Sequence, residues 1–373
     1  MQILLSLFYF FYFSIVGVYL IFMPKVLLEL GYSGDEIGVI FAAAPLVRFV
    51  LPFLFLRGLK IDRTTFNIAL IIMVLSSFAF YLSLGNFYAL LFSNIFLGVG
   101  MSLLNPYIEV ISLQVIGKER YGKIRLYGSV GFVMVALVLV KVLTSPYTAL
   151  GFLVSLTLIT AGISFIIAKQ VEKEEQSTLE ELNDIDLLKD YKLWLGLIFM
   201  QISFGSFYNF FTIYATNHSI SLTTTIYLWS FGVLVEIVML YFQGRFLRNN
   251  LIAILQLTTF LTAFRWYLVY AFSEDIFVLY FSQSLHAFSF ALFHSAAISY
   301  LYQLYKHKRL AQQFFSGISY GLGGLVGALL SGLIYEYYTE YLFLSSAVIA
   351  FSSFVFFTLW KQEVRELGRT QTS

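Results

Sequence analysis

The chain has 373 residues, of which 59% are hydrophobic, 19% aromatic and only 12% charged. An ordinary soluble domain carries about 25% charged residues, so this composition leaves too little polar surface to cover a soluble globule and nearly excludes a soluble enzyme. A net charge of +2 does not suggest a nucleic-acid partner, and the absence of cysteine rules out disulfides and thiolate metal sites. We therefore expect an integral membrane protein.

The apolar residues gather in long runs that match the thickness of a membrane. A helix needs about 20 apolar residues to cross a hydrocarbon core about 30 Å thick. The sequence predicts twelve such helices, at residues 4–28, 36–56, 65–84, 87–113, 124–143, 148–168, 192–216, 222–244, 251–272, 276–304, 311–334 and 341–360. Strands of a barrel are excluded because the runs are too long and do not alternate. The first run is too long for a signal peptide and no basic residue precedes it, so we expect it to be retained.

The basic residues test this number of helices, because cytoplasmic loops are enriched in Lys and Arg. With both termini in the cytoplasm, all 23 basic residues fall on cytoplasmic connections except Lys25 and Lys141, which are on the outer side, and Arg48 and Arg265, which lie within helices. One missed helix would reverse every later loop and destroy this pattern. We expect a multi-pass, lipid-embedded monomer of the cytoplasmic (inner) membrane.

A charged stretch at 169–192 divides the chain into two halves of six helices. The predicted domains are an N-terminal bundle (1–168), a cytoplasmic linker (169–191), a C-terminal bundle (192–361) and a cytoplasmic tail (362–373). Helices five and eleven are both rich in glycine, and small residues let helices approach closely in lipid. The fold class is therefore an all-α membrane protein with twelve helices in two six-helix bundles.

Few ionisable groups lie at membrane depth, where each costs about 2.5–3.5 kcal/mol and usually faces a partner or an interior cavity. They are Arg48, Glu109, Glu236, Arg265, His286 and His294, with Arg125 at the edge of helix five. Glu236 and Arg265 belong to consecutive helices and are able to neutralise each other, as are Glu109 and Arg125. The two histidines differ by about 80° around the helix and about 12 Å along it, so they can line one broad face but do not chelate one metal. Each either hydrogen-bonds as part of the packing or handles protons.

The motifs around these charges resemble the phenylpropionate permeases of the major facilitator superfamily. The motifs are residues 121–129 (YGKIRLYGS), 227–236 (YLWSFGVLVE), Arg265-Trp266, and 284–286 (SLH) with His294. The N-terminal half is also similar to the lactose permease and other oligosaccharide–proton symporters, at residues 10–13, 35–43 and 106–109. That resemblance implies that Glu109 and Arg125 hold the solute, and it matches Arg265 and His286 to a conserved Arg and His of that family.

The resemblance breaks at three positions that carry charge in the sugar permeases. Ser289 stands in place of their proton-releasing Glu, Val233 in place of a carboxylate of helix eight, and Gln283 in place of a Lys. Glu236 is therefore the first candidate for the protonation site, with His286 or His294 second. A structural salt bridge is the alternative role of Glu236. The sequence at Gly58, Asp62 and Arg63 resembles the superfamily's loop signature and implies a cytoplasmic gate.

We expect a proton-coupled symporter that moves a small organic solute by alternating access, and an aromatic carboxylate such as phenylpropionate is favoured. The residues expected to contact the solute are Arg48, Glu109, Arg125, Tyr208, Asn209 and Trp229. The alternatives are a sugar or nucleoside symporter, a drug–proton antiporter, and a membrane sensor or scaffold. The sequence has no HExxH, GxSxG or GxxxxGK[ST] motif, so no enzyme is predicted, and neither is a cofactor or metal.

Overall fold

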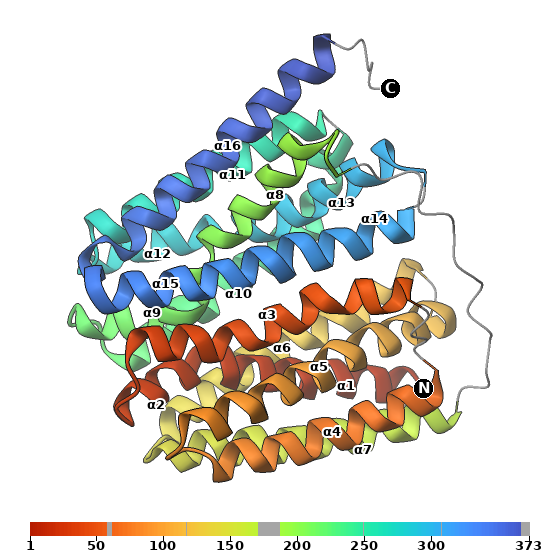
Figure 1. Cartoon of the computed structure of the whole chain (residues 1–373), viewed down its shortest axis with the longest axis vertical. Helices are drawn as coiled ribbons and strands as arrows, with labels where there is room; N and C mark the ends of the chain where they lie inside the picture. Colours follow the sequence, from red (N-terminus) through yellow and green to blue (C-terminus); the bar gives the residue numbers. More distant parts are fainter. Residues whose placement is uncertain (58–61, 117, 171–186, 249, 307, 367–373) are drawn as a thin grey trace.

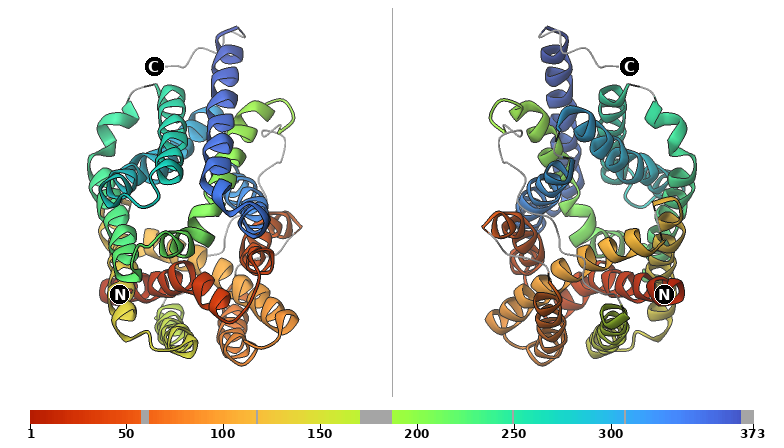
Figure 2. Two further views of the ribbon diagram at one scale, coloured as in Figure 1. Left: turned by 90° about the vertical axis from the view of Figure 1, so that its left-hand side faces the viewer. Right: turned by 90° about the vertical axis from the view of Figure 1, so that its right-hand side faces the viewer.

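The structure, a computed structural model, describes residues 1–57, 62–116, 118–170, 187–248, 250–306 and 308–366. Its helices form two bundles that lie side by side (Figure 1), and an end-on view separates the N-terminal half from the C-terminal half (Figure 2). Most of the predicted linker, residues 171–186, lies outside the described residues.

The N-terminal bundle begins with a helix that contains one wide π-helical turn. The elements are α1 (Gln2–Gly17), η1 (Val18–Phe22), α2 (Met23–Glu29), α3 (Gly34–Leu56), α4 (Arg63–Leu82), α5 (Phe87–Ile116), α6 (Lys118–Val142) and α7 (Pro146–Gln170). Pro45 and Pro52 lie inside α3, and Pro106 lies inside α5. Each proline removes a backbone hydrogen bond from its helix, a loss that helices in membranes tolerate when neighbouring groups compensate.

The C-terminal bundle contains more interrupted helices. Its elements are α8 (Tyr191–Ser203), α9 (Gly205–Asn217), α10 (Leu222–Phe242), η3 (Gln243–Arg248), α11 (Leu251–Ala271), α12 (Ile276–Ser284), η4 (Ala287–Leu292), α13 (Phe293–Leu304), α14 (Lys308–Phe314), η5 (Phe315–Gly323), α15 (Gly324–Tyr338), η6 (Thr339–Tyr341) and α16 (Leu342–Glu366). Two of the interruptions, η4 and η5, are π-helical turns, which occur often at functional sites.

Eleven helical stretches of the described chain are long and apolar enough to cross a membrane. The last of them, Leu310–Glu366, has 57 residues and is far too long for one crossing of a core about 30 Å thick. The chain leaves the helical conformation at Tyr338 (φ −143°, ψ 45°), and α16 then runs back beside the bundle (Figure 1). This stretch is therefore two spans, and the predicted fold of twelve helices is confirmed.

The helices give the molecule two ends, which we name by the residues they carry. The terminal end carries Met1, Gln170, Tyr191 and Glu366. The far end carries the turns that follow Glu29, Leu82, Val142, Asn217, Ala271 and Tyr338.

The two bundles touch along α3 and the eleventh span (η5 and α15), where glycines allow close contact. A Cβ atom added at Gly38 would lie 2.8 Å from the carbonyl oxygen of Ala328 and 2.9 Å from the Cα of Gly332. One added at Gly321 would lie 2.6 Å from the backbone nitrogen of Phe49. The close packing predicted from these glycines is therefore present, and it forms the seam between the bundles.

The C-terminal bundle is tied together at the terminal end by a buried tyrosine. The Tyr305 hydroxyl donates a hydrogen bond to Asp190 Oδ2 (2.7 Å) and accepts one from Trp194 Nε1 (3.2 Å). Burial, together with the hydrogen bond to Asp190, raises the pKa of Tyr305, so the hydroxyl stays protonated and remains a donor. The bond fixes the end of span ten to the start of span seven.

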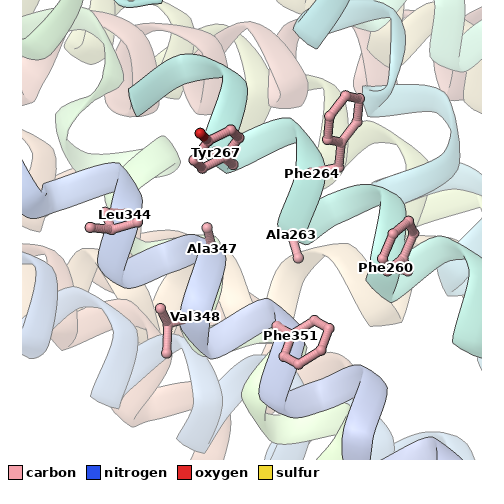
Figure 3. A pocket seen from close by; sticks show the side chains of 8 residues that line it. All are labelled: Phe260, Ala263, Phe264, Tyr267, Leu344, Ala347, Val348 and Phe351. Atoms are coloured by element: carbon pink, nitrogen blue, oxygen red, sulfur yellow. The ribbon is translucent and has the colours of Figure 1, made fainter. Parts of the chain in front are cut away.

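A shallow apolar groove lies between α11 and α16 (Figure 3). It has a volume of about 350 Å³, and its lining residues are Phe260, Ala263, Phe264, Tyr267, Leu344, Ala347, Val348 and Phe351. None of the ionisable groups predicted for the site lines this groove.

Candidate functional site

A fully buried arginine organises the polar centre of the C-terminal bundle. Arg265 on α11 donates from Nη1 to His286 Nδ1 and Ser289 Oγ, and from Nη2 to Gln283 Oε1, each at 2.9 Å. Its guanidinium also lies over the Phe207 ring, 4.5 Å from the centroid, and Trp266 is at 4.3 Å. All of these partners are uncharged, so the negative charge that balances Arg265 lies beyond them.

That charge belongs to Glu236 on α10, and His286 stands between it and the arginine. Glu236 Oε2 lies 3.5 Å from His286 Nε2, while His286 Nδ1 faces Arg265. Because a guanidinium only donates, Nδ1 must accept, and His286 is therefore the neutral tautomer with its proton on Nε2, toward Glu236. The expected pairing of Glu236 with Arg265 is thus made through the imidazole.

The two histidines lie along one broad face of span ten, as the sequence allows, with the Phe290 ring between them. The rings of His286 and Phe290 are stacked (5.4 Å, 4°), and those of Phe290 and His294 follow (6.4 Å, 18°). The π-helical turn η4 (Ala287–Leu292) lies between the two histidines. His294 Nδ1 lies 2.6 Å from the Tyr320 hydroxyl. His286, and not His294, is the histidine beside Glu236.

In the N-terminal bundle, Glu109 and Arg125 are held by aromatic residues. The Tyr121 hydroxyl donates to Glu109 Oε1 (3.0 Å), and the Arg125 guanidinium lies 3.8 Å above the Phe13 ring. Both residues are described, and no ion pair joins them in the described part of the chain. The cation–π contact leaves the donors of Arg125 available to another acceptor.

Arg48 lies on α3 between the prolines of that helix and is exposed. Its backbone oxygen lies 3.6 Å from the position of a Cβ atom added at Gly317 of span eleven, so Arg48 lies near the junction of the two bundles. Contact of Arg48 with the solute stays a prediction.

The aromatic and amide candidates on spans seven and eight differ in whether their polar groups already have a partner within the protein. Trp229 is only 4% exposed and donates from Nε1 to Thr212 (3.0 Å), so its polar group is already used. Tyr208 is half-buried and stacks on Phe204 (5.3 Å), and Asn209 follows it on α9. Asn209 is 7% exposed, and its contact with the solute stays a prediction.

The predicted gate residue Asp62 is the N-cap of α4. Its side chain accepts from the backbone nitrogen of Thr65 (2.7 Å), which satisfies a donor that the helix leaves open. Arg63 begins α4 and is exposed, whereas Gly58 of the same motif lies outside the described residues. A gating role for Asp62 and Arg63 stays a prediction.

Sequence reasoning did not identify Gln283, Ser289 and Tyr320 as members of this site. Gln283 and Ser289 stand three residues before and three residues after His286, a spacing that puts side chains on one helix face and signals a shared partner. Tyr320 belongs to another span, so only the folded chain reveals its contact with His294.

Comparisons with known proteins agree with this architecture. The model of the MFS_1 like family matches residues 2–345. The chain belongs to the MFS_1 like family. Among curated relatives, a "Probable 3-phenylpropionic acid transporter" of Escherichia coli (strain K12) is 25% identical over 368 residues, covering 93% of this chain and 94% of that protein. An "Uncharacterized transporter YwbF" of Bacillus subtilis (strain 168) is 24% identical, covering 87% and 83%.

Solved structures give the same fold. The nucleoside transporter NupG superposes with a TM-score of 0.78 at 18% identity, covering 96% of this chain and 98% of that one. The POT family transporter PepTSo gives a TM-score of 0.77 at 11% identity, covering 97% of each chain. These identities show the fold alone. With the family match, they make this member of the MFS_1 like family a multi-pass membrane transporter of the major facilitator type.

Proposed function

We propose that the protein is a proton-coupled symporter that takes up a small aromatic carboxylate across the inner membrane by alternating access. The observation that carries the proposal is the relay Glu236–His286–Arg265, in which one carboxylate neutralises one buried cation through a neutral imidazole. The location of the basic residues supports an orientation with the terminal end in the cytoplasm.

Charge balance around Arg265 explains how proton and solute become coupled. A proton on Glu236 removes the only carboxylate of the relay and leaves the charge of Arg265 uncompensated. An unpaired charge at depth is costly, so the protonated transporter favours an anionic solute. By linkage, the bound anion favours protonation to the same extent. Counting Glu236, Arg265, the proton and the solute anion alone, the empty state and the fully loaded state are both neutral, whereas the half-loaded states are not.

The same argument assigns the proton to Glu236 in preference to His286. Protonating Nδ1 of His286 would place two donors against each other at 2.9 Å and break the contact with Arg265. His294 is less suited because the Phe290 ring lies between it and His286.

The proposed solute contacts come from both bundles. Arg125 and Arg48 offer planar donor groups that suit a carboxylate. Tyr208 and Asn209 of α9 offer polar groups, and Tyr208 stacks on Phe204. This combination suits a ring with a polar substituent. The 25% identical relative described as a probable 3-phenylpropionic acid transporter supports this solute class.

Proton movement in proteoliposomes tests the proposal. Addition of 3-phenylpropionate should make the external medium more alkaline as proton and acid enter together, and 3-phenylpropionamide should not. Solute uptake without proton movement would contradict symport. Proton movement in the opposite direction would indicate an antiporter instead.

Nucleosides are the second solute class, favoured by the likeness to the nucleoside transporter NupG. A thermal-shift screen with 3-phenylpropionate, uridine and lactose side by side separates the classes. Stabilisation by uridine alone would replace the aromatic acid with a nucleoside. Such a solute is neutral, so its fully loaded state with a proton would carry a positive charge.

A further inference from the structure

We propose that Glu336 is a latch that holds the two bundles together at the far end. Its Oε2 accepts a hydrogen bond from the backbone nitrogen of Gly34 at 2.6 Å. Glu336 lies near the end of α15 in the C-terminal bundle, whereas Gly34 is the first residue of α3 in the N-terminal bundle. The bond therefore crosses the interface that must open if the transporter exposes its site at the far end.

The start of α3 leaves the backbone N–H of Gly34 available for this carboxylate. The first N–H groups of a helix have no acceptor within the helix, and they attract negative charge. Glu36 Oε2 reaches back to the backbone nitrogen of Ser33 (3.0 Å), as in a capping box. Asp35 accepts from the Ser33 hydroxyl. The N–H of Gly34 is left to Glu336.

Close packing around the latch fixes the position of Glu336. A Cβ atom added at Gly34 would lie 2.6 Å from Tyr335 Cδ1, so α3 and α15 touch at this point. The Tyr335 ring stacks on Phe210 (4.7 Å), and its hydroxyl accepts from Asn217 Nδ2 (3.1 Å). Tyr335 is therefore anchored in its own bundle, and this anchoring holds the backbone of the neighbouring Glu336 in place.

A second bond crosses the interface nearby, because Lys25 Nζ donates to Thr216 Oγ1 (3.3 Å). This contact is longer, and Lys25 also pairs with Glu29 (3.3 Å) in its own bundle. The Glu336 bond is the shorter of the two and ends on a backbone group that cannot swing away. Its loss should consequently shift the balance between far-end-closed and far-end-open forms.

This inference rests on the proposed rocking of the bundles, and its size follows from the type of bond. Hydrogen bonds to a charged group are about twice as strong as neutral ones, but Glu336 is exposed and water competes with Gly34. We expect the far-end-open population to rise about three- to tenfold when the carboxylate is removed.

Because the chain has no cysteine, two introduced cysteines can carry spin labels without background. Gly85→Cys and Glu274→Cys lie on far-end turns of different bundles. A Cβ at Gly85 meets no atom within 4 Å, and Glu274 is exposed. Double electron–electron resonance then reports the distance between the bundles at that end, without solute.

Glu336→Ala should increase the long-distance population, and Glu336→Gln should increase it less because an amide oxygen still accepts from Gly34. Glu340→Gln is the matched control, since it removes the same charge from another exposed glutamate at the same end. Distances in Glu336→Ala equal to those in the control would overturn the latch. If Glu336→Ala does not fold, an unchanged distribution in folded Glu336→Gln overturns it as well. Neither result depends on whether the protein moves protons. The distance measurement can therefore contradict the latch without contradicting proton symport, and the transport assays can contradict symport without contradicting the latch.

Discussion

Arg265 and Glu236 lie on opposite sides of one imidazole ring, with Arg265 Nη1 2.9 Å from His286 Nδ1 and Glu236 Oε2 3.5 Å from Nε2. The guanidinium fixes the tautomer of His286, and the tautomer aims a proton at the carboxylate. A change in the charge of Glu236 therefore reaches Arg265 through a single ring.

Arg265→Lys keeps the positive charge but removes the planar fork that bonds three acceptors. We expect uphill solute accumulation to fall at least tenfold, and the free energy of unfolding to fall by about 1–3 kcal/mol, because buried acceptors lose their donors. Accumulation assays and thermal melting measure the two effects. Arg245→Lys is the control, since Arg245 is exposed on η3. Accumulation by Arg265→Lys at the level of this control would remove Arg265 from the coupling machinery.

Arg125→Ala tests whether the N-terminal bundle binds the carboxylate of the solute. We expect the Kd for 3-phenylpropionate to rise about tenfold, since a hydrogen bond to a charged group contributes about 1.5–3 kcal/mol. The affinity for the corresponding neutral amide, where measurable, should change less. Equal losses for acid and amide in a thermal-shift titration would mean that Arg125 shapes the site without reading the charge.

Two glycine-to-alanine changes test the close packing within the N-terminal bundle. At Gly131, an added Cβ would lie 2.0 Å from the carbonyl oxygen of Phe10. Gly131→Ala should therefore destabilise the protein by about 1–3 kcal/mol. At Gly162 the same atom would meet nothing within 4 Å, so Gly162→Ala should be neutral or stabilising by up to about 1 kcal/mol. Melting temperatures in detergent decide, and equal stabilities of the two variants would contradict the contact of α1 with α6.

Asp62 allows the cap of α4 to be separated from a gate. Asn keeps a side-chain oxygen for the backbone of Thr65, so Asp62→Asn should retain stability, whereas Asp62→Ala should lose about 0.5–2 kcal/mol. If the charge of Asp62 also serves a gate, Asp62→Asn should slow transport without loss of stability. Transport by Asp62→Asn at the wild-type rate would leave the residue with the capping role alone.

The sequence predicts the fold well because the signals for membrane helices are local. Twelve apolar runs and the distribution of basic residues are sufficient for the twelve spans, and the glycines of span eleven mark the seam with α3. Partners across the interface, such as Gly34 with Glu336, depend on how distant spans meet, and no local pattern specifies them.

The sequence predicts the residues of the site better than their arrangement, for the same reason. The sequence identifies Glu236, Arg265 and His286 as rare charged groups at depth, but it does not show that the histidine lies between the other two. The sequence allows the two histidines of span ten to line one broad face, but it does not predict the π-helical turn η4 between them. The sequence places Gln283 and Ser289 on the same helix face as His286, but it does not show that both bond to Arg265.

Uphill transport by Glu236→Gln tests the central claim most directly. A glutamine keeps the size of Glu236 and mimics its protonated form, so the variant should lose proton-driven accumulation of 3-phenylpropionate while still exchanging labelled for unlabelled solute. Glu274→Gln, which changes an exposed carboxylate on a far-end turn, should still accumulate solute in response to a proton gradient. Wild-type accumulation by Glu236→Gln in energised vesicles would contradict the assignment of proton coupling to Glu236.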